Sequence, residues 1–278
     1  MIIFSDIDGT LFSQKWSRIP KSAKAAVQLA RKNGHKFFLC TGRGLATTNK
    51  YLNYDVDGFV FAVGSLIYVE GKKMYNHPIR EEVMDELIKN MDAIDIGYML
   101  EGSAGSYGND FGYECNSKYF AGAETDSSKV EEIMAENGIY HLSQWHKKDP
   151  IYKLVVFEKH ENHMQELELP EGLHIVPAKY DIFPHLTGEI SRSANNKATA
   201  IQRVIEYYGV SKEETVAIGD NTNDIEMLEY ANVGICMGNG APEAKEAADY
   251  ITTDIHEHGM WNALKYVGAI EGEYEGED

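Results

Sequence analysis

Asp6 and Asp8 bring two carboxylates together near the start of the chain, and Gly9 behind them permits a tight backbone turn. Two carboxylates in one place repel each other unless a cation neutralises them. Mg²⁺ suits such a pair, because it binds in proteins through one or two carboxylates, waters and the phosphate oxygens of a substrate. The pair is therefore tolerable if a divalent cation neutralises it. For an isolated Asp-Gly-Thr sequence, ordinary turn chemistry would be the better explanation.

A second set of oxygen-bearing side chains lies far along the chain, in the sequence Gly-Asp-Asn-Thr-Asn-Asp at residues 219–224. Asp220 and Asp224 are candidate metal ligands, because carboxylates are the donors that Mg²⁺ prefers. Taken alone, this loop could be an Asx-rich N-cap for the helix that follows it. Taken together with Asp6 and Asp8, the loop favours a shared metal site.

The segments before these loops explain how the loops could meet. Residues 2–5 and 215–218 are short apolar runs typical of strands buried on both faces, and residues 36–40 form a third such run just before Thr41. In a parallel sheet the carboxyl ends of the strands share one edge. We therefore expect both acidic loops and Thr41 to converge there.

Helical patterns alternate with these strands. Residues 22–32 carry apolar side chains at helical spacing, with Pro20 before them and Gly34 after them as start and stop signals. Further helices are predicted at residues 197–208, 225–230 and 242–248. Strands that alternate with helices predict an α/β fold, with a Rossmann-like parallel sheet core and helices on both of its faces.

The middle of the chain departs from this alternation. Residues 66–75 are typical of a β-hairpin, which is foreign to a purely parallel sheet. Helices are then predicted near residues 81–91 and 130–136, with strands near 98–100, 152–157 and 174–176. The sequence thus predicts a discontinuous Rossmann-like core over residues 1–81 and 188–278, with an inserted α+β domain over residues 82–187.

Composition limits the environment and the partners of the chain. A formal net charge of -18 over 278 residues repels nucleic acids and anionic membrane surfaces. Three scattered cysteines without a Cys-x-x-Cys pair argue against a disulfide framework and a structural zinc site, which favours the reducing cytoplasm. The apolar run at residues 1–4 is too short for a signal peptide or a membrane span, and no feature indicates an obligate protein partner.

Four ordered motifs resemble those of the haloacid dehalogenase-like hydrolases, in particular the Cof-type phosphatases with a large α/β cap of the C2 type. Residues 6–11 (Asp-Ile-Asp-Gly-Thr-Leu) resemble the first motif and residues 41–43 (Thr-Gly-Arg) the second. Lys197 resembles the third motif, and residues 219–227 resemble the fourth. The inserted domain also stands where the cap of these enzymes belongs.

This resemblance implies a role for each matching residue. Asp6 would be the nucleophile that forms an aspartyl-phosphate, and Asp8 the general acid and base. Mg²⁺ would be held by Asp6, Asp220 and the backbone carbonyl of Asp8, with Asp224 acting through water or orienting the other ligands. The phosphate group would be bound by the Ile7 and Gly42 N–H groups and by the side chains of Thr41, Lys197 and Asn223.

Several residues keep a simpler explanation. A lysine that opens a helix, such as Lys197, is usually solvated, and only its place in the order of motifs raises it to a site residue. His256 and His258 could suggest a metal, but loop histidines at a helix start are the commoner case. Residues 63–65 are Val-Gly-Ser where many relatives have Asn-Gly-Ala, a difference that bears on substrate choice.

The favoured function is a Mg²⁺-dependent phosphatase for a sugar phosphate or a similarly small phosphorylated metabolite. A phosphomutase of the same fold would need cations in the cap to hold a bisphosphate, and Arg80 is the one arginine between residues 65 and 188. A non-catalytic module that binds a phosphorylated metabolite usually lacks a nucleophile or a metal ligand, whereas all of these residues are present here.

Overall fold

The computed structural model describes residues 1–51, 54–122, 124, 126–178 and 187–276. Contacts within the chain divide it into two compact units. Unit 1 consists of Met1–Gly42, Tyr54–Tyr75 and Asn196–Asp278, and unit 2 consists of Arg43–Asn53 and Asn76–Asn195. None of the helices among the described residues is long and apolar enough to span a membrane.

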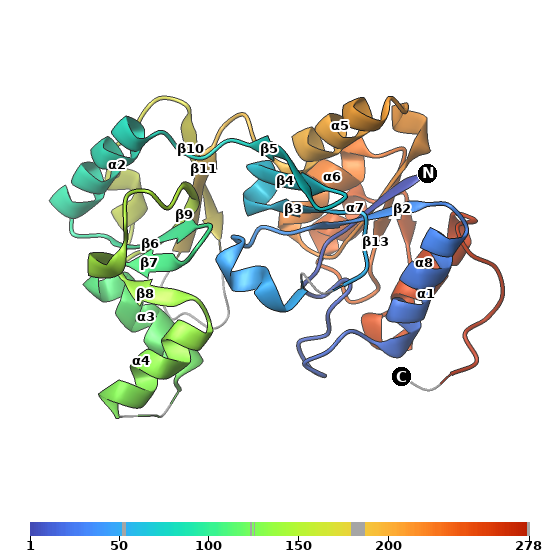
Figure 1. Ribbon diagram of the computed structural model, residues 1–278, viewed down its shortest axis with the longest axis horizontal. Coiled ribbons are helices and arrows are strands. Elements are labelled where there is room, and N and C mark those ends of the chain that lie inside the picture. Colours follow the sequence, from blue (N-terminus) through green and yellow to red (C-terminus); the bar gives the residue numbers. More distant parts are fainter. Residues whose placement is uncertain (52–53, 123, 125, 179–186, 277–278) are drawn as a thin grey trace. The chain divides into compact units, whose positions relative to one another are not determined.

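Unit 1 is built on an eight-stranded sheet in the order β14-β13-β12-β1-β2-β3-β4-β5 (Figure 1). Its strands are β1 (Ile2–Ser5), β2 (Lys36–Cys40), β3 (Gly58–Phe61), β4 (Leu66–Val69), β5 (Lys72–Asn76), β12 (Thr215–Gly219), β13 (Val233–Cys236) and β14 (Tyr250–Ile251). The strands from β14 to β3 are parallel, and β4 runs antiparallel to β3. The predicted hairpin thus forms the β4-β5 edge of this sheet.

Helices cover both faces of the unit 1 sheet. They are α1 (Lys21–Lys32), α5 (Lys197–Tyr208), α6 (Ile225–Tyr230), α7 (Pro242–Ala247) and α8 (Gly259–Tyr266). Apolar side chains of α5, α6 and α7 form one core cluster with Phe4, Phe38 and Ala217 of the sheet. Helices α1 and α8 lie side by side on the other face (Figure 1). The predicted α/β fold with helices on both faces is confirmed.

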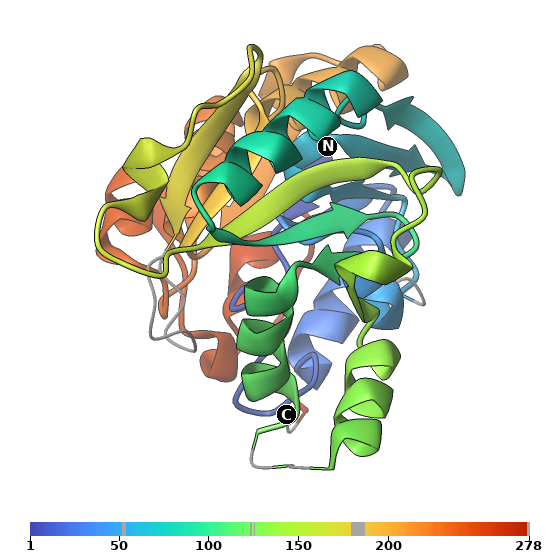
Figure 2. The same ribbon diagram turned by 90° about the vertical axis from the view of Figure 1, so that its left-hand side faces the viewer.

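Unit 2 contains a six-stranded mixed sheet in the order β10-β11-β9-β6-β7-β8. Its strands are β6 (Gly97–Gly102), β7 (Ser106–Gly108), β8 (Ile139–His141), β9 (Ile151–Phe157), β10 (Leu173–Ala178) and β11 (Thr187–Arg192). Helix α2 (Glu81–Ala93) packs on one face, and α3 (Asp110–Phe120) and α4 (Ser127–Glu136) pack on the other (Figure 2). Every residue of the central strand β9 is buried, as expected for a strand covered on both sides. The predicted inserted α+β module is confirmed.

The continuous part of unit 2, Asn76–Asn195, begins before and ends after the predicted insertion at residues 82–187. Residues 188–195 group with unit 2, because β11 pairs with β9 and β10 and therefore belongs to the second sheet. Residues 76–81 also group with unit 2, where the Ile79 N–H donates to the Ile151 carbonyl of β9 at 2.8 Å. The segment Arg43–Asn53, which the sequence assigned to the core, also groups with unit 2. All three cysteines are buried and free.

Candidate active site

Asp6 lies directly after β1, where the sequence predicted it. Its N–H donates to the Ile218 carbonyl at 2.9 Å, which continues the pairing of β1 with β12, and its side chain is almost fully buried. Gly9 has φ +90°, and a Cβ atom there would lie 2.3 Å from an Asp220 carboxylate oxygen. Glycine is therefore needed at this position both for its backbone conformation and for the close approach of the second acidic loop.

In the loop after β12, both carboxylate oxygens of Asp224 accept hydrogen bonds. One carboxylate oxygen accepts the N–H groups of Asp220 and Asn221, each at 3.0 Å. The residue is fully buried at the end of the 3₁₀ helix η6 (Thr222–Asp224). A Cβ atom on Gly219 would lie 2.6 Å from the Asp224 Cβ, so the loop can fold this tightly only with glycine there.

Lys197 connects the two acidic loops. This first residue of α5 is fully buried, and its ammonium nitrogen lies 2.6 Å from Asp6 Oδ1 and also hydrogen-bonds Asp224 Oδ1. A buried ammonium group is stable only when it is paired, and two carboxylates provide that here. The alternative of a solvated lysine at the helix start is excluded.

Burial and mutual repulsion perturb the acidic groups. Burial holds the pKa of Asp6 well above its usual range; the nearby carboxylates of Asp224 and Asp220 raise this pKa further, and Lys197 opposes the rise. Burial, followed by the charge of Asp224, raises the pKa of Asp220 to about 7. The pKa of Lys197 is itself raised by the two carboxylates, which keeps its ammonium group charged. Without a further cation, the site holds more negative charge than Lys197 neutralises.

Asp6, Asp220 and Asp224 each offer an oxygen, and these three oxygens lie within 4.8 Å of one another. A set of carboxylate oxygens is the donor chemistry that Mg²⁺ prefers. The excess negative charge and the close spacing therefore fit a divalent cation at this position. The Asp8 carboxylate is not among the three, although its charge is close enough to help raise the pKa of Asp220.

The remaining predicted site residues stand at or near the same edge of the sheet. Ile7 lies in the loop that carries Asp6, and its side chain is buried. Thr41, also buried, and Gly42 follow β2, whereas Asn223 is exposed in η6. Since β2 pairs with β1 in parallel, these loops start from neighbouring strand ends. Their grouping around a phosphate stays a prediction.

Two polar residues that the sequence did not single out support the loops. Thr10 is fully buried, and its hydroxyl donates to Asp220 Oδ1 at 2.7 Å. Asn239 donates to the Gly9 carbonyl at 2.8 Å and accepts the Ile255 N–H at 2.9 Å. Thr10 belongs to the first motif, residues 6–11, so its position in the sequence could have indicated a role at the site. The contact of Asn239 depends on a long-range approach that the sequence does not reveal.

The two loop histidines near the C-terminus have ordinary structural positions. His256 lies 2.9 Å from Asp254 Oδ1 through Nδ1 and 2.8 Å from the Ser13 hydroxyl through Nε2. His258 has a left-handed backbone conformation immediately before α8. These contacts favour the simpler explanation of histidines in a loop at a helix start.

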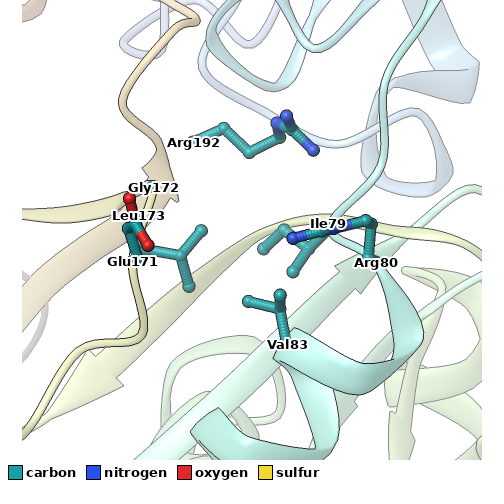
Figure 3. Close-up of a pocket in the computed structure, with 7 residues that line it drawn as sticks. All are labelled: Ile79, Arg80, Val83, Glu171, Gly172, Leu173 and Arg192. Atoms are coloured by element: carbon teal, nitrogen blue, oxygen red, sulfur yellow. The ribbon is translucent and has the colours of Figure 1, made fainter.

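A hollow also opens within unit 2, and no predicted site residue is among those that line it. Its volume is about 320 Å³, and Arg192 reaches across it from β11 (Figure 3). The other residues that line it are Ile79, Arg80, Val83, Glu171, Gly172 and Leu173. Asp6, Asp220 and Asp224 are not among the residues that line it, so this hollow does not mark the site of the acidic cluster.

Known proteins resemble this chain in sequence and in fold. Residues 3–264 match the family of haloacid dehalogenase-like hydrolases. The Bacillus subtilis protein YkrA is 26% identical over 275 residues, which cover 97% of this chain and 98% of YkrA. Phosphatase YwpJ, also from Bacillus subtilis, is 24% identical over 288 residues and covers 96% of this chain and 99% of its own length.

Two solved structures have the same fold over almost the whole chain. The subclass IIB sugar phosphatase BT4131 aligns with a TM-score of 0.74 at 24% identity, covering 97% of this chain and 99% of its own. The phosphatase BT1666 from Bacteroides thetaiotaomicron aligns with a TM-score of 0.76 at 22% identity, covering 97% and 95%. The resemblance read from the motifs is confirmed, and so is the expectation of an enzyme of this class. The chain belongs to the haloacid dehalogenase-like hydrolases and has the fold of their subclass IIB.

Proposed function

We propose that this chain is a Mg²⁺-dependent phosphatase that hydrolyses a small phosphomonoester, such as a sugar phosphate, through an aspartyl-phosphate on Asp6. The observation that carries this proposal is the position of Asp6. Its carboxylate lies between a buried lysine and two further carboxylates, at the edge of the sheet where parallel strands end. The similarity to phosphatases over nearly the whole chain supports the same activity.

Asp6 and Asp220 would hold Mg²⁺ directly, with the backbone carbonyl of Asp8 as a further ligand. Asp224 already accepts two backbone N–H groups and the Lys197 ammonium, so we assign it an orienting role. When bound there, Mg²⁺ would offset the repulsion between the nucleophilic carboxylate and the anionic substrate.

The reaction follows from the two aspartates. An Asp6 oxygen attacks phosphorus and forms a new P–O bond while the bond to the leaving alkoxide breaks. Asp8, in its protonated form, gives the alkoxide a proton, so that the alcohol leaves neutral. Asp8 then removes a proton from water, the water oxygen attacks phosphorus, and the bond to Asp6 breaks. The products are an alcohol and inorganic phosphate, and Asp6 is restored.

The phosphate would be held by cations and N–H groups from several loops. Lys197 supplies a fixed positive charge within 2.6 Å of the nucleophile. The N–H groups of Ile7 and Gly42 and the side chains of Thr41 and Asn223 would donate to the phosphate oxygens. Such donors stabilise charge that develops in the transition state, because they are already oriented before the reaction.

Phosphate release from a panel of phosphomonoesters tests this proposal, with and without Mg²⁺. Asp6→Asn keeps the size of the side chain and removes the nucleophile, and Asp85→Asn, on the exposed surface of α2, is the matched control. We expect release that requires Mg²⁺, disappears in Asp6→Asn and persists in Asp85→Asn. Following the reaction by ³¹P NMR separates inorganic phosphate from phosphate moved to a second hydroxyl.

Three results would contradict the proposal. Transfer of phosphate without release would indicate a mutase, and binding of phosphorylated ligands without turnover would indicate a binding module. Undiminished hydrolysis by Asp6→Asn would exclude Asp6 as the nucleophile.

A further inference from the structure

A second cluster of metal-binding side chains lies in unit 2, in the connection between β9 and β10. It consists of His160, His163 and Glu166, which each offer a ligand atom within 4.8 Å of the other two. His163 and Glu166 lie on the 3₁₀ helix η4 (His163–Glu166). Side chains three residues apart in a 3₁₀ helix point to the same side, which explains why the sequence spacing brings these two together.

His160 joins them because the chain reverses just before the helix. Asn162 has a left-handed backbone conformation with φ 62°, which asparagine tolerates better than most residues. This turn places the ring of His160 against that of His163, with the ring centroids 3.8 Å apart and the planes inclined by 26°. His160 and Glu166 are exposed, whereas His163 is buried, so two of the three side chains are free to adjust their torsions.

The ring of His163 is already oriented as that of a metal ligand. Its Nε2 lies 2.6 Å from the Ile94 carbonyl oxygen, which can only accept a hydrogen bond. Nε2 therefore carries the proton, and Nδ1 of the neutral ring keeps its lone pair. Histidines that bind metals usually donate their other ring N–H to a carbonyl or carboxylate in this way, which fixes the tautomer and the ring orientation. From the described residues Nδ1 accepts one hydrogen bond, a long one of 3.4 Å from the Lys159 N–H.

The charges around the cluster also favour a cation. The ammonium group of Lys159 is paired with Asp95 at 2.6 Å. Glu158 is buried and accepts the Met164 N–H at 2.9 Å, and Glu161 stands next to His160 in the chain. The neighbourhood therefore has an excess of negative charge even before Glu166 is counted.

We propose that His160, His163 and Glu166 bind a divalent transition cation of the Zn²⁺ class. Two imidazole nitrogens and one carboxylate oxygen form a donor set that suits Zn²⁺ and its neighbours in the first transition row. Three protein ligands leave a position for water. The oxygen-only cluster of unit 1 differs in chemistry, because it suits Mg²⁺.

Calorimetric titration of the full chain with Zn²⁺, in excess Mg²⁺, tests this site. The titration uses a chain carrying Asp220→Asn, which weakens the acidic cluster of unit 1 as a competing site. His160→Gln and Glu166→Gln each remove an exposed ligand and leave the bond from His163 to Ile94 in place, so both variants should fold. His146→Gln removes an exposed histidine outside the cluster and is the matched control.

We expect one equivalent of Zn²⁺ to bind, with an affinity that falls by about tenfold or more in His160→Gln and in Glu166→Gln and is unchanged in His146→Gln. Co²⁺ used as a spectroscopic probe should give visible absorption bands that both ligand variants lose. Absence of binding in the parent chain, or equal affinity in the parent and the two ligand variants, would overturn the assignment.

Discussion

The ammonium nitrogen of Lys197 lies 2.6 Å from an Asp6 carboxylate oxygen, in a place where water does not reach it. The same ammonium group also hydrogen-bonds Asp224, so two carboxylates that are far apart in the sequence share one cation. Removal of one partner from such a buried group leaves the other charges without compensation. The lysine is therefore important both for the stability of the site and for the proposed reaction.

We expect Lys197→Met to lower kcat/KM for phosphate release by about 100-fold or more, since a fixed charge next to the transferred phosphate is lost. The unfolding free energy should also fall by about 3 kcal/mol, because Asp6 and Asp224 stay buried without their cation. Phosphate release and urea denaturation measure these two effects. Lys32→Met, at the exposed end of α1, controls for the loss of a lysine and should change neither. Wild-type activity in Lys197→Met would remove this residue from the site.

The hydroxyl of Thr10 orients Asp220 through a hydrogen bond of 2.7 Å. Thr10→Val keeps the shape of the side chain and removes the donor, so we expect the Mg²⁺ concentration for half-maximal activity to rise by about tenfold. Thr10→Ser keeps the donor and should restore most of the affinity. A Mg²⁺ titration of activity measures the difference. Equal Mg²⁺ dependence in the valine and serine variants would show that the hydroxyl does not orient the ligand.

Gly9 and Gly34 offer a matched pair for separating backbone strain from steric conflict. Both have φ +90°, but a Cβ at Gly9 would meet an Asp220 oxygen at 2.3 Å, whereas a Cβ at Gly34 would meet no atom of the described residues within 4 Å. Each alanine variant should be destabilised by about 1 to 2 kcal/mol by the backbone conformation. Only Gly9→Ala should also lose Mg²⁺-dependent activity, because Asp220 must move. Thermal denaturation and phosphate release compare the two variants, and equal activity in both would contradict the steric argument.

The backbone after β3 contains a residue in an unfavourable conformation. Val63, in the 3₁₀ helix η2 (Ala62–Gly64), has φ 54° and ψ 35°, which β-branched residues rarely adopt. Asparagine tolerates this region better than a β-branched residue does. We expect Val63→Asn to raise the free energy of unfolding by about 1 kcal/mol. Val63→Thr keeps the β-branch while adding a polar atom and should give no gain. Equal stability of these two variants would show that polarity and not backbone strain decides the effect.

The acidic cluster could be predicted because it depends on the direction and order of the strands more than on the packing of individual side chains. Once Asp6 and the 219–224 loop are placed after parallel strands, both must reach the same edge of the sheet. The burial of Lys197 could not be predicted from its surroundings in the sequence, where it begins an amphipathic helix and would usually be solvated. Its burial results from the approach of the start of α5 to the end of β1, a long-range contact.

Helix α3 was missed for a local reason. Gly112 lies inside it, and glycine weakens a helix in isolation. The structure explains the residue, because a Cβ at Gly112 would lie 2.1 Å from the Tyr98 carbonyl oxygen of β6. Packing against β6 thus requires glycine at this position, although glycine lowers the helix propensity of the segment.

We expect a buried charge cluster in unit 2 to make the free energy of unfolding depend on pH. Glu101 on β6 faces Lys153 on β9, and Glu101 Oε2 is 3.9 Å from the ammonium nitrogen. This oxygen is buried without a hydrogen-bond partner among the described residues, because Lys153 lies closer to Glu189, at 2.8 Å. Burial raises the pKa of Glu101, and the charge of Glu189 adds to this rise. The charges of Lys153 and Arg43 and the Gly44 N–H offset only part of it.

The sign of the effect follows from this raised pKa. A carboxyl group that is easier to protonate in the folded state adds stability below its unfolded pKa, and this stability is lost as the pH rises through the folded pKa. Glu101→Gln cannot titrate, so its unfolding free energy should exceed that of the wild type at pH 7 and approach it below pH 4.5, the ordinary value for glutamate. Urea denaturation across this range measures the difference, and Glu136→Gln, at the exposed end of α4, controls for the loss of one negative charge. A Glu101→Gln variant that is less stable than the wild type at neutral pH would contradict this argument. It would show that the charge of the ionised Glu101 is well compensated, although its Oε2 has no hydrogen-bond partner among the described residues.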